Sequence, residues 1–280
     1  MNLLLEPLIH VLPIWLRNKF RDSDLSHILE FRLRLGQTVE IVTTVGSQWL
    51  DRIVQEDDLR FCINMASKYS PWTATSLYSG YITIEGGHRI GIAGCWAMDD
   101  AGRRCIQSIT SLCIRVSKDL RNISQDLYLF QGSLLIVGRP GSGKTTLLRD
   151  LIRSISENCT GSVCVIDERK EIFPMSNNRM CFPIGPRTDV LSGCSKVKGI
   201  DMAIRCMGPQ KIAVDEITAK DDCSALMEAA WCGVHILATA HASGRDDLYR
   251  RPIYKPLIEC NLFQGLVVVN QDKSWCFERM

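Results

Sequence analysis

The sequence predicts an α/β protein of two domains. A smaller α+β domain is expected over residues 1–120, and a mostly parallel sheet covered by helices over residues 121–280. Three observations predict this division. The chain has 280 residues, about twice a typical domain length. Beyond residue 131, short apolar segments alternate with amphipathic segments of helical length, which is typical of parallel α/β sheets. Residues 117–131, between the two patterns, are polar and weakly periodic.

Composition and charge narrow the class of protein. With 46% hydrophobic and 23% charged residues, the chain is neither disordered, collagen-like nor a coiled-coil rod. Its net charge of +2 lacks the basic excess of most nucleic-acid-binding proteins, so no direct nucleic-acid partner is expected. The 13 cysteines form no C-x-x-C pair, which favours reduced thiols in a cytoplasmic protein over disulfides or a zinc site. No apolar run reaches the roughly 18 residues of a membrane-spanning helix.

The elements of the first domain follow from local patterns. Glu6 and Pro7 interrupt the pattern of a signal peptide, so the N-terminus is interpreted as a capping helix. Arg32 and Arg34 alternate with apolar residues, which predicts a half-buried strand. The Gly86-Gly87 pair predicts the turn of a hairpin. In chain order, we expect a helix over 1–20, strands over 31–35 and 39–45, a helix over 56–66, a hairpin over 81–95 and a strand pair over 106–116.

The second domain shows short buried strands and longer amphipathic helices. Leu147, Leu148, Leu151 and Ile155 recur at helical spacing. The apolar runs between the helices are only a few residues long and lack alternation, as expected for strands buried on both faces. We expect strands over 134–137, 163–166, 212–214 and 234–239, and helices over 145–155 and 223–231.

A phosphate-binding motif lies between the first strand and helix of this domain. Its pattern is G-x-x-x-x-G-K-[ST]. Backbone N–H groups of such a loop hold the β-phosphate of a nucleotide, Lys144 would contact the β- and γ-phosphates, and the Thr145 hydroxyl would bind Mg²⁺. The motif therefore predicts ATP and Mg²⁺ as ligands. The residues assigned to nucleotide binding are Gly138, Arg139, Pro140, Gly141, Ser142, Gly143, Lys144, Thr145 and Thr146.

Polar residues at other strand ends are expected to complete the site. Asp215 follows a buried strand and is predicted to bind Mg²⁺ together with Thr145, while Glu216 would orient or deprotonate the attacking water. Glu168 and His241 follow two further strands. Because ligands of open parallel sheets bind beyond the carboxyl ends of the strands, these side chains should converge on one crevice. His241 would sense the γ-phosphate, and Glu168 is an alternative catalytic carboxylate.

The order of these motifs resembles the Walker A, Asp box, Walker B and His box of type II/type IV secretion ATPases, which have a RecA-like P-loop domain. Residues 80–83, 86–91, 185–191 and 238–241 are more specific, because they resemble the stage III sporulation protein AA family of endospore-forming bacteria. The resemblance extends from about residue 28 to the C-terminus. At Ile217 the chain departs from the glycine that is expected after the Asp-Glu pair.

The resemblance implies a cytoplasmic ATPase of the mother cell. It would lie at the membrane through partner proteins, as the motor of a secretion-like channel into the forespore, and would form a homo-oligomer, a hexameric ring. An arginine finger would then complete each site. Arg89 and Arg115 are the candidates from the N-terminal domain, which packs over the nucleotide in secretion ATPases; Arg187 and Arg205 lie in the ATPase domain. Arg89 is equally well explained as a brace of its hairpin.

Three other functions remain open at this stage. Residues 191–195 resemble the start of an ABC transporter signature, but they follow Lys144 too closely for the helical subdomain of that class. A catalytically silent nucleotide-binding scaffold is the second alternative, against which the intact Lys144, Thr145, Asp215 and Glu216 argue. A nucleic-acid motor is the third, and the charge balance does not favour it.

Overall fold

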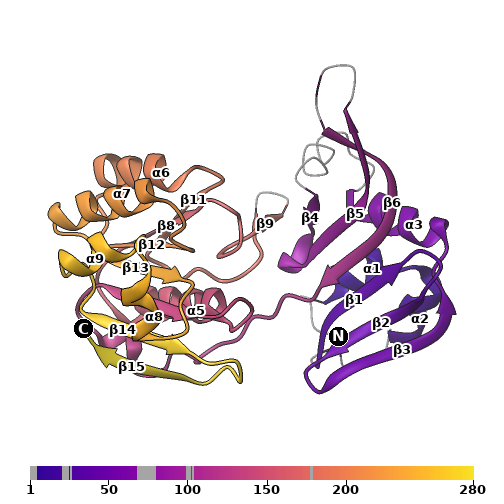
Figure 1. The fold of residues 1–280 in the computed structure, drawn as a ribbon, viewed down its shortest axis with the longest axis horizontal. Helices are drawn as coiled ribbons and strands as arrows, with labels where there is room; N and C mark the ends of the chain where they lie inside the picture. Colours follow the sequence, from indigo (N-terminus) through magenta and orange to yellow (C-terminus); the bar gives the residue numbers. More distant parts are fainter. Residues whose placement is uncertain are drawn as a thin grey trace. The chain divides into compact units, whose positions relative to one another are not determined.

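The computed structural model of the protein describes residues 5–20, 25, 27–67, 80–98, 102, 104–176 and 179–280. The chain divides into two compact units (Figure 1). The first contains Met1–Lys118 and Pro174–Phe182, and the second contains Asp119–Phe173 and Pro183–Met280. The main division thus lies two residues before the boundary that the sequence suggested. No pattern in the sequence indicates that Pro174–Phe182 belongs to the first unit.

The described part of the first unit contains a six-stranded antiparallel sheet with the strand order β3-β2-β1-β6-β5-β4. Two predicted elements differ from the structure. The capping helix is two short helices separated near Pro13, and its first four residues lie outside the described residues. The expected strand pair over 106–116 is one strand, β6, paired along its length with β5. The elements are α1 (Glu6–Val11), α2 (Ile14–Phe20), β1 (Ile28–Arg34), β2 (Thr38–Thr43), β3 (Gly46–Ile53), α3 (Glu56–Ser67), β4 (Tyr81–Thr83), β5 (Arg89–Met98) and β6 (Arg104–Arg115).

The predicted alternation in β1 is present. Phe31 and Leu33 are fully buried in the core that the helices cover. Arg32 and Arg34 project to the other face, where they form ion pairs with Glu30 and Glu40 at 2.7 and 2.8 Å. These arginines are neutralised by neighbours of the same sheet.

The Gly86-Gly87 turn packs against Pro174–Phe182, the later segment of the chain that belongs to this unit. In this segment, β9 (Met175–Ser176) pairs with β10 (Arg179–Met180) in an antiparallel arrangement. Gly87 has a φ of +75°, and a Cβ atom there would lie 2.8 Å from the ring of Phe182. Glycine is therefore required both by the backbone conformation and by the close approach. His88, fully buried, accepts a hydrogen bond from the Ser117 amide at 3.0 Å.

The second unit holds, in its described residues, a seven-stranded sheet with the order β11-β8-β12-β13-β7-β14-β15. All neighbouring pairs are parallel except β14 with β15. The predicted strands and helices are present to within a few residues, and several others were not predicted. The main elements are β7 (Leu134–Gly138), α5 (Lys144–Asn158), β8 (Val163–Asp167), β11 (Thr188–Ser192), α6 (Lys196–Met202), β12 (Lys211–Val214), α7 (Lys220–Trp231), β13 (His235–Ala240), α8 (Arg245–Arg250), α9 (Lys255–Glu259), β14 (Gly265–Val269) and β15 (Trp275–Arg279).

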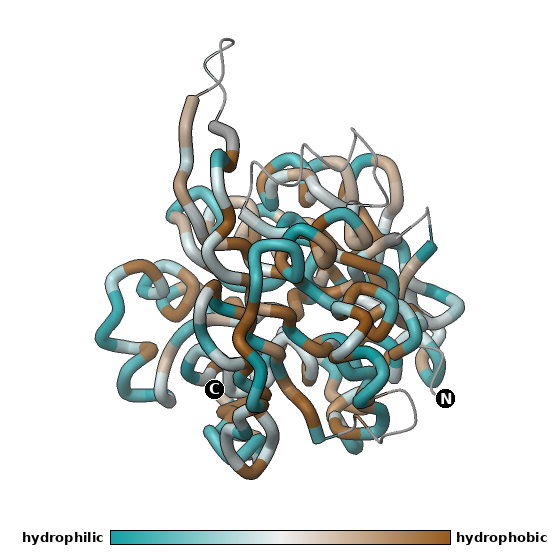
Figure 2. The backbone as a smooth tube through the Cα atoms, turned by 90° about the vertical axis from the view of Figure 1, so that its right-hand side faces the viewer, coloured by the Kyte–Doolittle hydropathy of each residue, from teal (hydrophilic) through white to brown (hydrophobic). Residues whose placement is uncertain are grey.

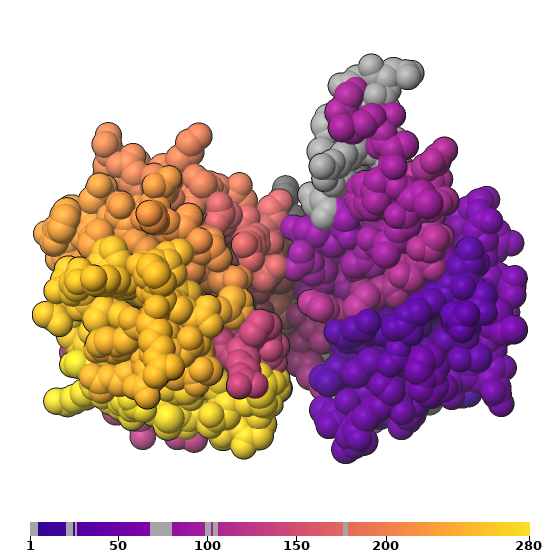
Figure 3. All heavy atoms as spheres, viewed as in Figure 1, coloured from indigo at the N-terminus to yellow at the C-terminus, as the bar shows by residue number. Residues whose placement is uncertain are grey.

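Helices cover both faces of this sheet. Leu135, Val137 and Ile236 pack with residues of α6 to α9 in one apolar core, and α5 lies on the opposite side of the strands (Figure 1). Figure 2 shows that apolar and hydrophilic stretches alternate along the backbone and that many turns are hydrophilic. In the face drawn in Figure 3, the segment that follows β13 forms a large, continuous part of this unit's surface.

The polar segment before β7 is attached to α5 rather than free. Asp150 of α5 is 1% exposed and accepts hydrogen bonds from the amides of Asn122 and Ser124 at 3.1 and 2.8 Å. The Ser124 hydroxyl donates a further bond at 2.7 Å, and Arg153 forms a buried ion pair with the same carboxylate. Because buried charges are tolerated only when they are paired, this network fixes the segment on the helix that follows the P-loop.

Candidate nucleotide-binding site

The P-loop joins β7 to α5, as the motif predicted. Gly141 and Gly143 have φ values of +73° and +103°, which favour glycine. At Gly138 a Cβ atom would lie 2.5 Å from Ser142 Oγ and 2.7 Å from the Val269 carbonyl. Ser142 Oγ is buried and has no hydrogen-bond partner among the described residues. A concave loop with an unpaired buried hydroxyl at a helix N-terminus fits a phosphate group.

Lys144 is folded back onto its own loop. Its Nζ donates to the carbonyls of Gly138 and Arg139, both at 3.1 Å, and lies 3.0 Å from His241 Nδ1. Burial lowers the pKa of Lys144, whereas the charges of Asp215 and Glu216 act in the opposite direction. The ammonium is thus held by neutral acceptors, which phosphate oxygens would replace with charged ones.

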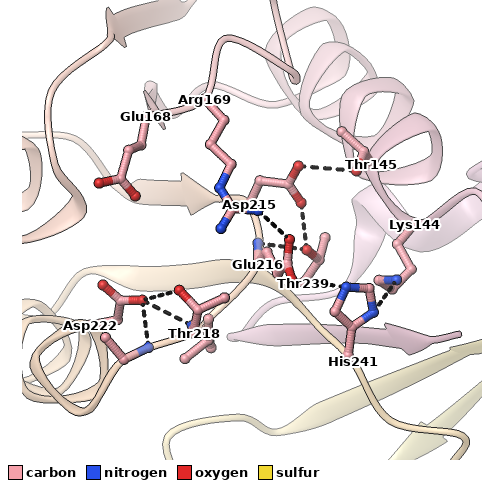
Figure 4. Close-up of polar contacts among 12 residues, drawn as sticks. Lys144, Thr145, Glu168, Arg169, Asp215, Glu216, Thr218, Asp222, Thr239 and His241 are labelled. Carbon is pink, nitrogen blue, oxygen red and sulfur yellow. Dashed lines mark hydrogen bonds and ion pairs between the residues drawn. The ribbon is translucent and has the colours of Figure 1, made fainter. Parts of the chain in front are cut away.

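The predicted Mg²⁺ ligands lie side by side. The hydroxyl of Thr145 donates to Asp215 Oδ2 at 3.0 Å, and the hydroxyl of Thr239 donates to Asp215 Oδ1 at 2.5 Å (Figure 4). Oxygen donors of this kind suit Mg²⁺, which binds through one or two carboxylates together with substrate phosphates.

Glu216 is held on both of its carboxylate oxygens. His241 Nε2 lies 2.9 Å from Oε1, and Arg169 donates to Oε2 at 2.8 Å. The backbone of Glu216 has a φ of +41°, and its amide donates to Thr239 Oγ1 at 2.8 Å. Because the Lys144 ammonium can only donate, His241 Nδ1 is the acceptor and Nε2 carries the hydrogen. His241 therefore connects Lys144 with Glu216.

Glu168 does not join this group. Its carboxylate pairs with Lys196 of α6 at 2.7 Å, and Lys196 lies 3.6 Å from Asp222. In Figure 4, Arg169 is directed toward Asp215 and Glu216, whereas Glu168 points away from them. The preceding Asp167 is buried, which raises its pKa, and accepts three backbone hydrogen bonds from residues 171–173. Of the two glutamates, Glu216 is therefore the one that is connected to the P-loop, through His241 and Lys144.

The four candidate arginine fingers have local partners. Arg89 lies over the ring of Tyr81 at 3.7 Å, and Arg115 forms an ion pair with Glu30 at 3.2 Å. In the second unit, Arg187 donates to the carbonyl of Ser156, and Arg205 pairs with Asp201 on the surface of α6. The structure brings neither of these two into contact with the P-loop residues described above.

Sequence reasoning missed three residues of the site. Thr239 is fully buried and connects Asp215 with the Glu216 backbone; a hydroxyl in an otherwise apolar strand was the available signal. Arg169 directly follows the predicted Glu168 in the sequence, and it is Arg169 that contacts Glu216. Lys273, in the turn between β14 and β15, donates to the carbonyl of Gly141, and no sequence signal pointed to it because that hairpin was not predicted.

Comparison with known proteins identifies the family. The family model for sporulation stage III, protein AA matches residues 6–276. The chain belongs to this family. Stage III sporulation protein AA of Bacillus subtilis (strain 168) is 34% identical over 283 residues, which cover 96% of this chain and 92% of that protein. The resemblance stated from the sequence is thereby confirmed.

Solved structures with a similar fold include an ATPase and a pilus motor. The ATPase DotB of Legionella pneumophila has a TM-score of 0.64 at 19% identity, over 96% of this chain and 80% of that one. The pilus retraction motor PilT, solved with bound ADP, has a TM-score of 0.60 at 16% identity, over 95% of this chain and 82% of that one. This likeness confirms the predicted RecA-like fold with its N-terminal domain. None of the described helices of this member of the family is long and apolar enough to cross a membrane.

Proposed function

We propose that this chain hydrolyses ATP with Mg²⁺ and acts as the motor of a secretion-like membrane channel between mother cell and forespore. The observation that carries the proposal is the contact between Thr145 and Asp215 at 3.0 Å. It joins the end of the P-loop to an acidic strand end, which is the arrangement that a nucleotide-bound Mg²⁺ requires. Membership of a sporulation family, the fold shared with the ATPase DotB and the resemblance of the sequence motifs to those of secretion ATPases support the wider role.

Each residue has a distinct task in this proposal. The P-loop amides and Lys144 would bind the phosphates, and Thr145 and Asp215 would hold Mg²⁺, which when bound would supply charge neutralisation at the phosphate oxygens. Glu216 orients the water and accepts its proton. His241, which contacts both Lys144 and Glu216, is placed to respond to the γ-phosphate.

Two variants test these roles. Lys144→Ala is expected to abolish nucleotide binding, whereas Glu216→Gln should bind ATP without turning it over, because the lysine contacts ground-state phosphates and the glutamate acts on water in the transition state. Lys198→Ala, on the exposed face of α6, is the matched control. Near-normal turnover by Glu216→Gln would show that the assignment is wrong, and Glu168→Gln would then be tested.

The alternative functions give different results. A silent scaffold would bind ATP without turnover in the wild-type protein. A nucleic-acid motor would be stimulated by DNA or RNA. Against an ABC transporter subunit, Leu191 and Ser192 belong to β11 and pair with β8, whereas a signature motif is expected to begin a helix.

Location and partners can be tested by sedimentation. We expect the protein expressed alone to remain in the supernatant and to reach membranes only with the membrane proteins of the channel, since no described helix could span a bilayer. Tight binding to protein-free liposomes would contradict this part of the proposal and assign the anchoring to the chain itself.

Self-association is the remaining part of the proposal. If a hexameric ring forms, specific activity should rise with protein concentration, and Arg89 or Arg115 would act across an interface. Mixing Glu216→Gln chains with Arg89→Ala chains should then restore some turnover, where an intact Glu216 meets an intact Arg89. Activity that is independent of concentration, or no recovery despite proven co-assembly, would contradict it.

A further inference from the structure

Arg169 is the positively charged side chain that holds Glu216 in this state. It follows β8, whose neighbour in the sheet is β12, the strand that leads to Asp215 and Glu216. The guanidinium donates to Glu216 Oε2 at 2.8 Å (Figure 4). The side chain of Arg169 is 51% exposed, and that of Glu216 is 25% exposed. The pair therefore lies at the open side of the site.

The ion pair between Arg169 and Glu216 can be broken at little cost in free energy. A largely solvated ion pair contributes little to stability, because water screens the charges and two long side chains must be ordered. A guanidinium binds phosphate oxygens through two parallel hydrogen bonds, and a triphosphate carries more charge than one carboxylate. A bound γ-phosphate would thus compete effectively with Glu216 for Arg169.

The ion pair also fixes the direction of the Glu216 carboxylate. Its Oε1 is paired with His241 and its Oε2 with Arg169, and each oxygen keeps a second lone pair. A carboxylate that accepts a proton from water needs a lone pair directed at that water. Transfer of Arg169 to the phosphate would let Oε2 turn toward the water.

We propose that Arg169 is a γ-phosphate-binding arginine supplied by the same chain. It rests on Glu216 without nucleotide and moves to the γ-phosphate when ATP binds, which stabilises the charge of the transferring group and frees Glu216. This inference rests on the proposed ATP hydrolysis. It differs from the trans-acting candidates Arg89 and Arg115, because here the cation and the carboxylate belong to one site.

Binding measurements test the inference without relying on turnover. The variants are Arg169→Ala, Arg169→Lys and, as the matched control, Arg60→Ala, which removes another exposed arginine from an ion pair with Glu56 at 2.7 Å. Titrations with ADP and with ATPγS give the two affinities. In Arg169→Ala, affinity for ATPγS should fall about tenfold or more while affinity for ADP changes little, as expected for loss of a charge-assisted hydrogen bond. Arg169→Lys should recover part of the loss.

Equal losses for ADP and ATPγS, or no loss, would overturn the inference, since a purely structural role cannot distinguish the two ligands. Turnover gives a second readout: kcat should fall roughly 10²-fold or more in Arg169→Ala. If the wild-type protein does not hydrolyse ATP, the proposed function fails, but the titrations still decide the role of Arg169. Arg169→Ala and Glu216→Gln chains, mixed and co-purified, should show no recovery of turnover, and recovery would overturn the same-chain assignment.

Discussion

Replacement of Thr239 by valine is expected to destabilise the second unit strongly, although the two side chains have nearly the same shape. The Thr239 hydroxyl donates to Asp215 at 2.5 Å and accepts from the Glu216 amide at 2.8 Å, in a side chain with no exposed surface. A hydrogen bond to a charged group is worth about 1.5–3 kcal/mol and one to an amide about 1 kcal/mol. Loss of both predicts about 2.5–4 kcal/mol.

Urea or thermal denaturation without nucleotide measures this loss. For a domain of this size the melting temperature should fall by about 5–16 °C. Thr239→Ser keeps the hydroxyl and should recover much of the difference, and Thr110→Val, at an exposed hydroxyl of β6, should remain within about 0.5 kcal/mol of the wild type. A Thr239→Val protein within about 1 kcal/mol of the wild type would refute the claim that this hydroxyl holds the two acidic residues in place.

Three further predictions concern packing and thiol chemistry. Asp150→Ala should cost about 3–5 kcal/mol in urea denaturation, because it leaves Arg153 buried without its main partner, whereas the exposed Asp126→Ala should be neutral. Gly138→Ala should abolish ADP binding in a fluorescence titration, since its Cβ would lie 2.5 Å from Ser142 Oγ; Gly91→Ala, which meets only ordinary contacts, is the control. Brief alkylation at pH 8 with mass spectrometry should leave Cys62 unmodified, because burial raises the pKa of its thiol to about 12, and should modify the exposed Cys232.

The core of the site was predictable because it depends on local patterns. A P-loop requires its glycines and lysine at fixed spacing, and Asp215 directly follows a short apolar run that reads as a buried strand. Since parallel strands share one carboxyl edge, the sequence predicted that Thr145 and Asp215 lie at the same edge of the sheet. The same argument predicted the position of His241, which directly follows β13.

The remaining details depend on tertiary contacts. Glu168 and Arg169 are adjacent in sequence, and two tertiary ion pairs, Lys196 with Glu168 and Arg169 with Glu216, accompany their different directions. β3 was missed because almost all of its side chains are exposed and show no apolar alternation. β6 is a single strand rather than a pair because β5 is long enough to match it, with irregular registers near Gly94.

In the described state, the charged side chains Lys144, Asp215 and Glu216 all have hydrogen-bond or ion-pair partners within the chain. Lys144 rests on two loop carbonyls, Asp215 on two hydroxyls and Glu216 on Arg169 and His241. His241 makes these sets interdependent, because its two ring nitrogens face Lys144 and Glu216. In the proposed reaction, phosphate oxygens that draw Lys144 from its carbonyls also remove the donor from Nδ1, and the imidazole then loses the contact that orients it toward Glu216. The proposed function therefore predicts that phosphate binding at Lys144 and release of the Glu216 carboxylate are coupled through His241.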